Sequence, residues 1–185
     1  MIMMEQPSLS LNSHDVPGPH YKMWRTVSMP KGISPTQVVQ EIANTQTMAM
    51  GFGLRLANVV INCHGYTGGQ GLSTGGHGQP GFTAANVNLF GALAGMNIAP
   101  IWLVACQAAR PPAGIAFCQA LANAAKTVVI AGEDNQRLTL YQNYRYYLGL
   151  SGQIDDYEGT VYIFYPNGTY IRGIDPEEHM WTVKV

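Results

Sequence analysis

The sequence predicts an α/β fold, a three-layer sandwich with a mostly parallel sheet and a C-terminal β-hairpin. Short apolar runs rich in β-branched residues, which are typical of buried strands, recur at residues 56–62, 99–105 and 127–131. Segments with helical spacing stand between these runs, and such alternation indicates parallel strands covered on both faces. Near the end of the chain, Pro-Asn-Gly at 166–168 separates two strand-like runs, which is a hairpin signal.

Length and composition limit the class of protein. The 185 residues favour one domain, and we expect a flexible arm over residues 1–20 and a single α/β domain over 21–185. Charged residues make up only 11% and the formal net charge is −1, which argues against nucleic-acid binding because phosphate contacts need clustered Lys and Arg. The sequence shows neither an apolar run long enough for a membrane span nor a secretory signal. We therefore expect a cytoplasmic protein, or one exported by a route that needs no signal peptide.

The first part of the chain is expected to hold an arm, a strand and a long helix. Pro-Gly-Pro at 17–19, with no apolar period before it, predicts the arm, and residues 23–29 predict a first strand. Ser34 followed by Pro35 is typical of a helix start, and apolar spacing continues this helix to about Met50.

The rest of the chain alternates strands with helices and ends in the hairpin. A glycine-rich loop over 65–81 is expected to form either a mobile flap over a cleft or a surface loop. Tyrosines at 141, 144, 146 and 147 favour helix packing or a partner surface. The expected elements are strands at 56–62, 99–105 and 127–131, helices at 84–95, 115–125 and from 135 to about 148, and hairpin strands at 161–165 and 169–173.

Two neighbouring strand ends carry reactive side chains. The first buried strand ends at His64 and the second at Cys106, and the intervening crossover predicts that the two strands are neighbours in a parallel sheet. An imidazole and a thiol at these positions supply the base and the nucleophile of a thiol enzyme. Backbone N–H groups of Gly65 and Cys106 are candidates for binding a developing oxyanion, since Gly65 has no side chain to obstruct the approach.

The two signatures, VVINCHG and IWLVACQ, resemble those of the clan CD cysteine peptidases, which include caspases, legumains and gingipains. The segment FCQALANAAKTVVIAG that follows is similar to caspase-like modules of bacterial toxins and effectors. The resemblance covers about residues 56–134. It implies a caspase-haemoglobinase fold, with His64 as general base and Cys106 as nucleophile in a dyad without an obligatory third residue. It also suggests Glu133 or Asp134 as an acidic specificity residue, although either is equally suited to capping a helix.

We therefore expect a cysteine endopeptidase that acts through an acyl-enzyme on itself or on a specific protein or peptide. The alternatives are a non-catalytic pseudo-peptidase that binds a partner, and a thiol acyltransferase or deamidase with the same dyad. His77 in the glycine-rich loop is a candidate substrate contact or an exposed loop residue. Cys63 and Cys118 are expected to be buried. We expect no cofactor and no metal site, since His14, His20 and His179 have no partner at ligand spacing, and we expect a homodimer as one state of assembly.

Overall fold

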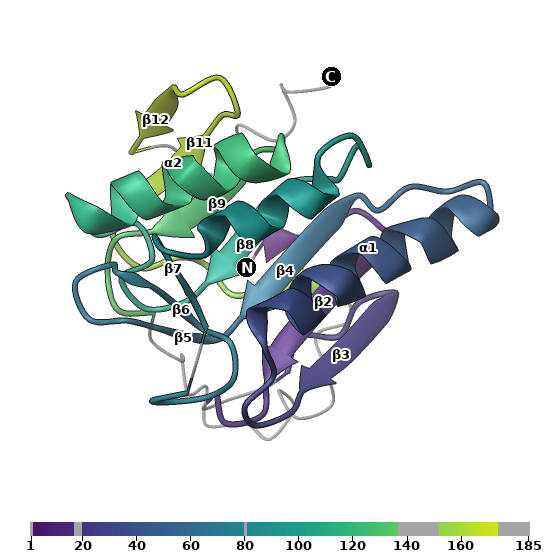
Figure 1. Cartoon of the computed structure of the whole chain (residues 1–185), viewed down its shortest axis with the longest axis horizontal. Helices are drawn as coiled ribbons and strands as arrows, with labels where there is room; N and C mark the ends of the chain where they lie inside the picture. The colour runs from purple at the N-terminus through teal and green to yellow at the C-terminus, as the bar shows by residue number, and fades with distance from the viewer. Residues whose placement is uncertain (1, 17–19, 80, 137–151, 174–185) are drawn as a thin grey trace.

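A mixed seven-stranded sheet forms the centre of the molecule (Figure 1). The structure is a computed structural model that describes residues 2–16, 20–79, 81–136 and 152–173. The strands of the central sheet are β2 (Ser8–Ser13), β3 (Arg25–Met29), β4 (Asn58–Asn62), β8 (Ile101–Val104), β9 (Val129–Gly132), β11 (Val161–Phe164) and β12 (Tyr170–Arg172).

The strand order confirms the predicted α/β class and the mostly parallel sheet. Across the sheet the order is β12-β11-β9-β8-β4-β2-β3. The five strands from β9 to β3 are parallel, whereas β11 is antiparallel to β9 and β12 is antiparallel to β11. The expected C-terminal hairpin is therefore present as β11 and β12, and it forms one edge of the sheet.

Helices cover one face of the sheet. They are α1 (Pro35–Gly51), the 3₁₀ helix η1 (Val87–Leu93) and α2 (Ala113–Ala125), and their buried apolar residues form one cluster with alternate residues of the sheet. The α1 helix begins as predicted, because Ser34 and Gln37 form a reciprocal capping box at its first turn.

The predicted helix over 84–95 is wrong in type and extent. Only Val87–Leu93 are helical, as a 3₁₀ helix, and its N-cap residue Asn86 makes no side-chain capping bond to the helix. Glycines at 91 and 95 weaken an α-helix because glycine has high backbone entropy in the unfolded chain. A short 3₁₀ segment still buries Val87, Phe90 and Leu93 against the sheet.

The opposite face of the sheet is covered by irregular segments and a two-stranded sheet. Ile2, Met4, Tyr21 and Met23 pack on it, and β1 (Ile2–Met3) pairs with β10 (Gln153–Ile154). Among the described residues this face carries no helix, so a second helical layer stays a prediction. The helix expected from 135 to about 148, with its four tyrosines, lies outside the described residues beyond position 136.

The prediction that residues 1–20 form an arm is wrong for the part that the structure describes. Residues Ser8–Ser13 form β2, which is fully buried and lies between β3 and β4. Leu9 and Leu11 join the core under the helices. The strand expected over 23–29 is present as β3, but it follows β2 and lies at the edge of the sheet.

The glycine-rich loop folds into a small antiparallel sheet of its own. It contains β5 (His64–Gly65), β6 (Gly71–Ser73) and β7 (Phe82–Thr83). Gly71 and Gly81 have no room for a side chain, because a Cβ at either position would lie 1.9 Å from a carbonyl oxygen of the neighbouring strand. Glycine at these positions therefore allows the strands of the loop to pair closely.

Candidate functional site

Three adjacent strands of the central sheet end at the same level, and a polar or reactive side chain follows each of them. The strands β2, β4 and β8 pair in register through Asn12↔Asn62 and Asn62↔Val104. Asp15, His64 and Cys106 each come two positions after the last residue of one of these strands. His64 and Cys106 thus follow neighbouring strands, as the sequence predicts, and Asp15 follows the strand on the other side of β4.

Asp15 and His64 lie at the point where the winding of the sheet reverses. From β2 the chain crosses to β3 at one edge, and from there it moves back through β4, β8 and β9 toward the other edge. In open parallel sheets, ligands bind at such a switch point, beyond the carboxyl ends of the strands. The gap between the ends of β2 and β4 is therefore the expected location of a site in this fold.

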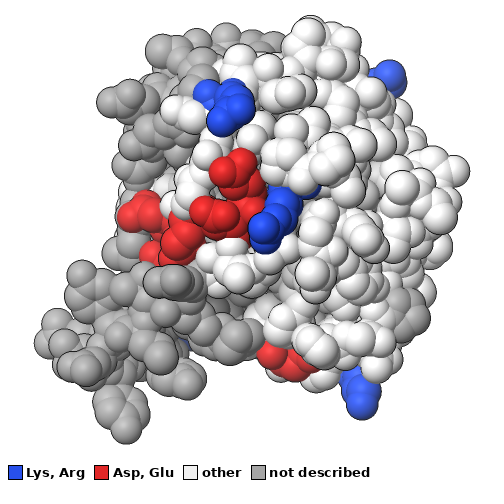
Figure 2. Space-filling model, turned by 90° about the vertical axis from the view of Figure 1, so that its left-hand side faces the viewer, with Lys and Arg blue, Asp and Glu red and all other residues white. Residues whose placement is uncertain are grey.

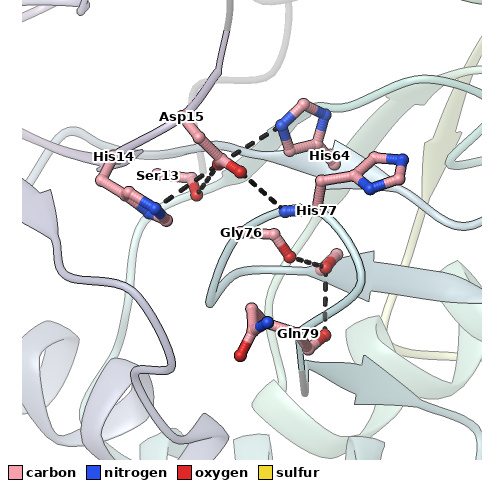
Figure 3. A network of polar contacts seen from close by, with 8 residues as sticks. Ser13, His14, Asp15, His64, Gly76, His77 and Gln79 are labelled. Atoms are coloured by element: carbon pink, nitrogen blue, oxygen red, sulfur yellow. Dashed lines mark hydrogen bonds and ion pairs between the residues drawn. The ribbon is translucent and has the colours of Figure 1, made fainter.

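Asp15 is the centre of a polar network that joins three segments (Figure 3). Its Oδ1 lies 3.3 Å from His64 Nε2 and 3.8 Å from His14 Nδ1. The Ser13 hydroxyl donates to Oδ1 at 3.0 Å, and the His77 backbone N–H donates to Oδ2 at 2.8 Å. The contact with His64 has the length of an ion pair but not the angle of a hydrogen bond, and Nε2 is buried without another partner among the described residues.

The charge of Asp15 is favoured by this network. Partial burial by itself raises the pKa of Asp15, but the hydrogen bonds from His77 and Ser13 and the nearby imidazoles of His64 and His14 outweigh it, so that the pKa is lowered. A carboxylate beside Nε2 favours the tautomer that carries its proton there. The other ring nitrogen, Nδ1, is then left with a lone pair to accept a proton.

His77 closes the network from the glycine-rich loop. Its ring contacts the His64 ring edge-on, with centroids 5.6 Å apart, while its backbone N–H binds Asp15. This approach requires a glycine at position 76, where φ is +107° and a Cβ would lie 2.5 Å from the His14 ring. The Ser73 hydroxyl holds the same turn through contacts with the carbonyls of Gly76 and Gln79. The sequence-predicted candidate His77 therefore lies beside His64.

Gly65 connects the two predicted dyad residues through the backbone. A Cβ at Gly65 would lie 1.7 Å from the carbonyl oxygen of Cys106 and 2.8 Å from its carbonyl carbon. The β5 strand therefore lies directly on the Cys106 backbone, and His64 stands one residue before this contact. Glycine is required here for space.

Among the described residues, neither N–H group of the predicted oxyanion site has a backbone partner. Tyr66 donates to the Gly71 carbonyl at 3.0 Å, and the alternation of an antiparallel ladder turns the Gly65 N–H away from β6. The Cys106 N–H makes no hydrogen bond to any other residue that the structure describes. No backbone acceptor in the described part of the chain thus occupies either donor.

The Cys106 side chain is partly exposed, and its thiol contacts a carbonyl oxygen. Sγ lies 3.7 Å from the Gln136 oxygen, and within the described chain it makes no hydrogen bond with His64. The next residue, Gln107, adopts a left-handed conformation with φ 57°. Its amide side chain accepts from the Gly68 N–H at 2.8 Å and donates to Asn135 at 2.9 Å. Gln107 thus joins the loops that follow β5 and β9 on either side of Cys106.

The other two thiols are buried, as the sequence predicts. Burial raises the pKa of both Cys63 and Cys118, and for Cys63 the neighbouring Cys106 and Asp15 raise it further. Buried thiols of this kind are poor nucleophiles because they stay protonated. Cys106 is therefore the reactive candidate of the three.

Glu133 and Asp134, the predicted specificity residues, directly follow β9 at the same end of the sheet. Glu133 Oε2 accepts a hydrogen bond from the Tyr162 hydroxyl at 2.9 Å, whereas Asp134 is exposed and lies against Gly159. Figure 2, turned toward the side where the strands end, shows acidic side chains gathered in one group beside basic ones. Glu133 is thus held by the fold, and Asp134 is the more accessible of the two.

Asp15 is the site residue that sequence reasoning missed. It follows the alternating segment SLSLNS, whose period of two is a strand signal.

Within the described ranges, no group of three or more His, Cys, Asp or Glu residues is arranged to hold a metal ion. Nor does any helix in those ranges combine the length and hydropathy that a membrane crossing needs.

Fold and site together define an α/β protein with an acid, an imidazole and a thiol at adjacent strand ends. Comparison with protein-family models, with curated proteins and with solved structures gives no match to this chain.

Proposed function

We propose that this protein is a cysteine endopeptidase of the caspase-like type, with His64 as general base and Cys106 as nucleophile. The observation that carries the proposal is the close approach of Gly65 to the Cys106 backbone, which sets the residue after His64 against the thiol-bearing residue at the neighbouring strand end. The signatures VVINCHG and IWLVACQ support the same assignment, since each contains one of these two residues in its last two positions. The mostly parallel sheet with both residues beyond strand ends is also compatible with a caspase-haemoglobinase fold.

The reaction follows from the two residues and the backbone donors. His64 Nδ1 accepts the Cys106 thiol proton, and the thiolate attacks the carbonyl carbon of the scissile peptide bond. The N–H groups of Gly65 and Cys106 bind the oxygen that becomes negative. The C–N bond then breaks, His64 returns the proton to the leaving amine, and a thioester remains on Cys106. Water hydrolyses the thioester, with His64 accepting its proton and returning it to the thiol.

Asp15 serves in this scheme as a positioning residue. Its carboxylate lies 3.3 Å from His64 Nε2, and its lowered pKa keeps it charged at neutral pH. A negative charge at this place stabilises the imidazolium that forms when His64 takes the thiol proton. The dyad expected from the resemblance thus becomes an arrangement of three residues from three adjacent strands.

Alkylation of Cys106 tests the dyad. Intact mass spectrometry follows the rate of iodoacetamide addition at pH 6, where an ordinary thiol reacts slowly because it is almost fully protonated. Wild type should gain one adduct quickly, because Cys63 and Cys118 are buried. His64→Ala should slow this reaction at least about tenfold. His20→Ala, a histidine outside the network, serves as the control and should react like wild type.

The activity itself requires a second measurement. Wild type and Cys106→Ala are incubated with a peptide library, and cleavage is detected by mass spectrometry. Cleavage that the substitution abolishes is the expected result. Slow alkylation in both wild type and His64→Ala, together with uncut peptides, would overturn the proposal.

One observation favours a second candidate function, a pseudo-peptidase that binds a partner. The Cys106 thiol is turned toward the Gln136 carbonyl at 3.7 Å rather than toward His64. A thiol held there packs without reacting. Folded protein with an unreactive Cys106 would support this function.

A further inference from the structure

An apolar pocket of about 560 Å³ opens between the glycine-rich loop and helix α2. Tyr66 and Thr83 contribute one wall, and Ala113, Ala116 and Phe117 from the first half of α2 contribute the other. None of the residues that line the pocket is charged. Its size falls within the range of ligand pockets, which is about 300–1,000 Å³.

The pocket owes its width to small side chains. Alanines at 84, 85, 113 and 116 line it, and only Phe117 and Tyr66 bring aromatic rings. Hydroxyl and amide groups of Tyr66, Gln70 and Thr83 supply the few polar atoms. The Tyr66 hydroxyl donates to the Gln79 carbonyl at 2.9 Å, so that its hydrogen is already engaged. Such a lining favours an apolar occupant, because a charge placed there would lose its hydration without gaining a partner.

Each wall includes residues from a segment that follows one of the two dyad residues. Tyr66 is the second residue after His64, and α2 begins seven residues after Cys106. The walls are fixed to each other, because a Cβ at Gly69 would lie 2.8 Å from the backbone of Gly114 in the first turn of α2. The Gly68 N–H also binds Gln107, the residue after Cys106. The segments that line the pocket are thus packed against each other close in sequence to the two dyad residues.

We propose that this pocket is the subsite for a large apolar side chain, aromatic or branched aliphatic, of the peptide substrate near the bond that Cys106 attacks. This inference rests on the proposed peptidase function and gives it a substrate class. An apolar anchor in the pocket fixes the peptide beside the thiol, while the Gly65 and Cys106 amides hold the reacting carbonyl. The acidic residues that follow β9 belong to another strand end and make no part of this pocket's lining.

The first test measures binding without catalysis. The Cys106→Ala protein is titrated with N-acetyl-phenylalaninamide, N-acetyl-leucinamide, N-acetyl-glycinamide and N-acetyl-lysinamide, and amide shifts are followed by ¹H–¹⁵N NMR. The phenylalanine and leucine probes should shift the signals of Ala113 and Ala116, and the other two should not. Ala116→Trp, which fills the pocket from an exposed position of α2, should weaken this binding at least tenfold. Ala92→Trp, at an exposed alanine of η1 outside the pocket, is the matched control and should bind like its parent.

The second test measures cleavage by the otherwise wild-type protein. Ala116→Trp should lower kcat/KM at least tenfold for peptides with a large apolar residue near the cut, whereas Ala92→Trp should leave it unchanged. Cleavage whose preference is the same in wild type and Ala116→Trp overturns the subsite and leaves the peptidase function intact. Apolar probe binding that Ala116→Trp removes, with no cleavage of any peptide, upholds the pocket and overturns the peptidase function. Equal shifts from all four probes, or none, overturn the subsite.

Discussion

Replacement of Gly65 by alanine gives the sharpest test of the contact between the two strand ends. The added Cβ would lie 1.7 Å from the Cys106 carbonyl oxygen, more than 1 Å closer than the 3.0 Å limit that real Cβ atoms respect. The atom that the new Cβ meets belongs to the Cys106 backbone, so no change of side-chain rotamer can relieve the clash. Either β5 or the turn at Cys106 must shift, and both carry a residue of the proposed dyad.

The magnitude of the effect follows from this single contact. Overpacking of a well-packed region costs about 1–3 kcal/mol. We expect the upper half of that range, since the clash is severe and its partner is rigid. A loss of 2–3 kcal/mol lowers the Tm of a chain of this size by about 4–12 °C. Gly65 lies outside the positive-φ region, so none of this cost arises from backbone strain.

Gly91→Ala is the matched control for this substitution. Position 91 is also a glycine without positive φ, but a Cβ there meets nothing within 4 Å. Alanine should therefore be neutral or stabilise the fold by about 0.4–1 kcal/mol. Thermal unfolding and the alkylation rate of Cys106 are measured for both variants. Equal Tm values for Gly65→Ala and Gly91→Ala, with equal alkylation rates, would refute the close packing of β5 on Cys106.

Three further substitutions test the network and the fold. Asp15→Asn should destabilise the protein by about 1 kcal/mol at pH 7. Because the pKa of Asp15 is lowered in the folded protein, this difference should shrink as the pH falls below the ordinary Asp value, and a Tm difference that is the same at pH 7 and pH 3 would contradict the assignment. Tyr162→Phe removes the hydrogen bond to Glu133 and should cost about 1–2 kcal/mol in urea unfolding, where an unchanged midpoint would show that the bond contributes nothing. Ser34→Ala removes the N-cap of α1 and should cost about 1 kcal/mol, whereas Ser28→Ala on the exposed face of β3 should not, and equal stabilities would contradict the capping box.

The central strands could be predicted from the sequence because strands that are buried on both faces consist mainly of apolar residues. The strands β4, β8 and β9 are covered on both faces, so they appear as continuous apolar runs. Their order along the chain, with crossovers between them, also predicts that the ends of β4 and β8 are neighbours. The neighbouring positions of His64 and Cys106 follow from this inference alone.

The strand β2 could not be found by the same criterion, since four of its six buried side chains are polar. Ser10 and Asn12 lie on the face opposite the helices, where they bind the backbone of Tyr21 through the Ser10 hydroxyl and the Asn12 side chain. Asn62 of β4 also donates to Asn12 at 3.0 Å. A polar residue can be buried in this way only when its hydrogen bonds are satisfied, and the partners come from distant parts of the chain.

Missing β2 meant missing Asp15, because a residue in a flexible arm has no fixed position. The buried amides explain why its position is fixed. Asn12 and Asn62 face each other in the register of β2 and β4, and their hydrogen bond is lost if either strand slips by one residue. The same slip would turn Cys63, now in the core, toward the position of His64. The polar pair thus selects the one register in which the carboxylate that follows β2 meets the imidazole that follows β4, and it does so at the reversal point where an open sheet leaves room for a substrate.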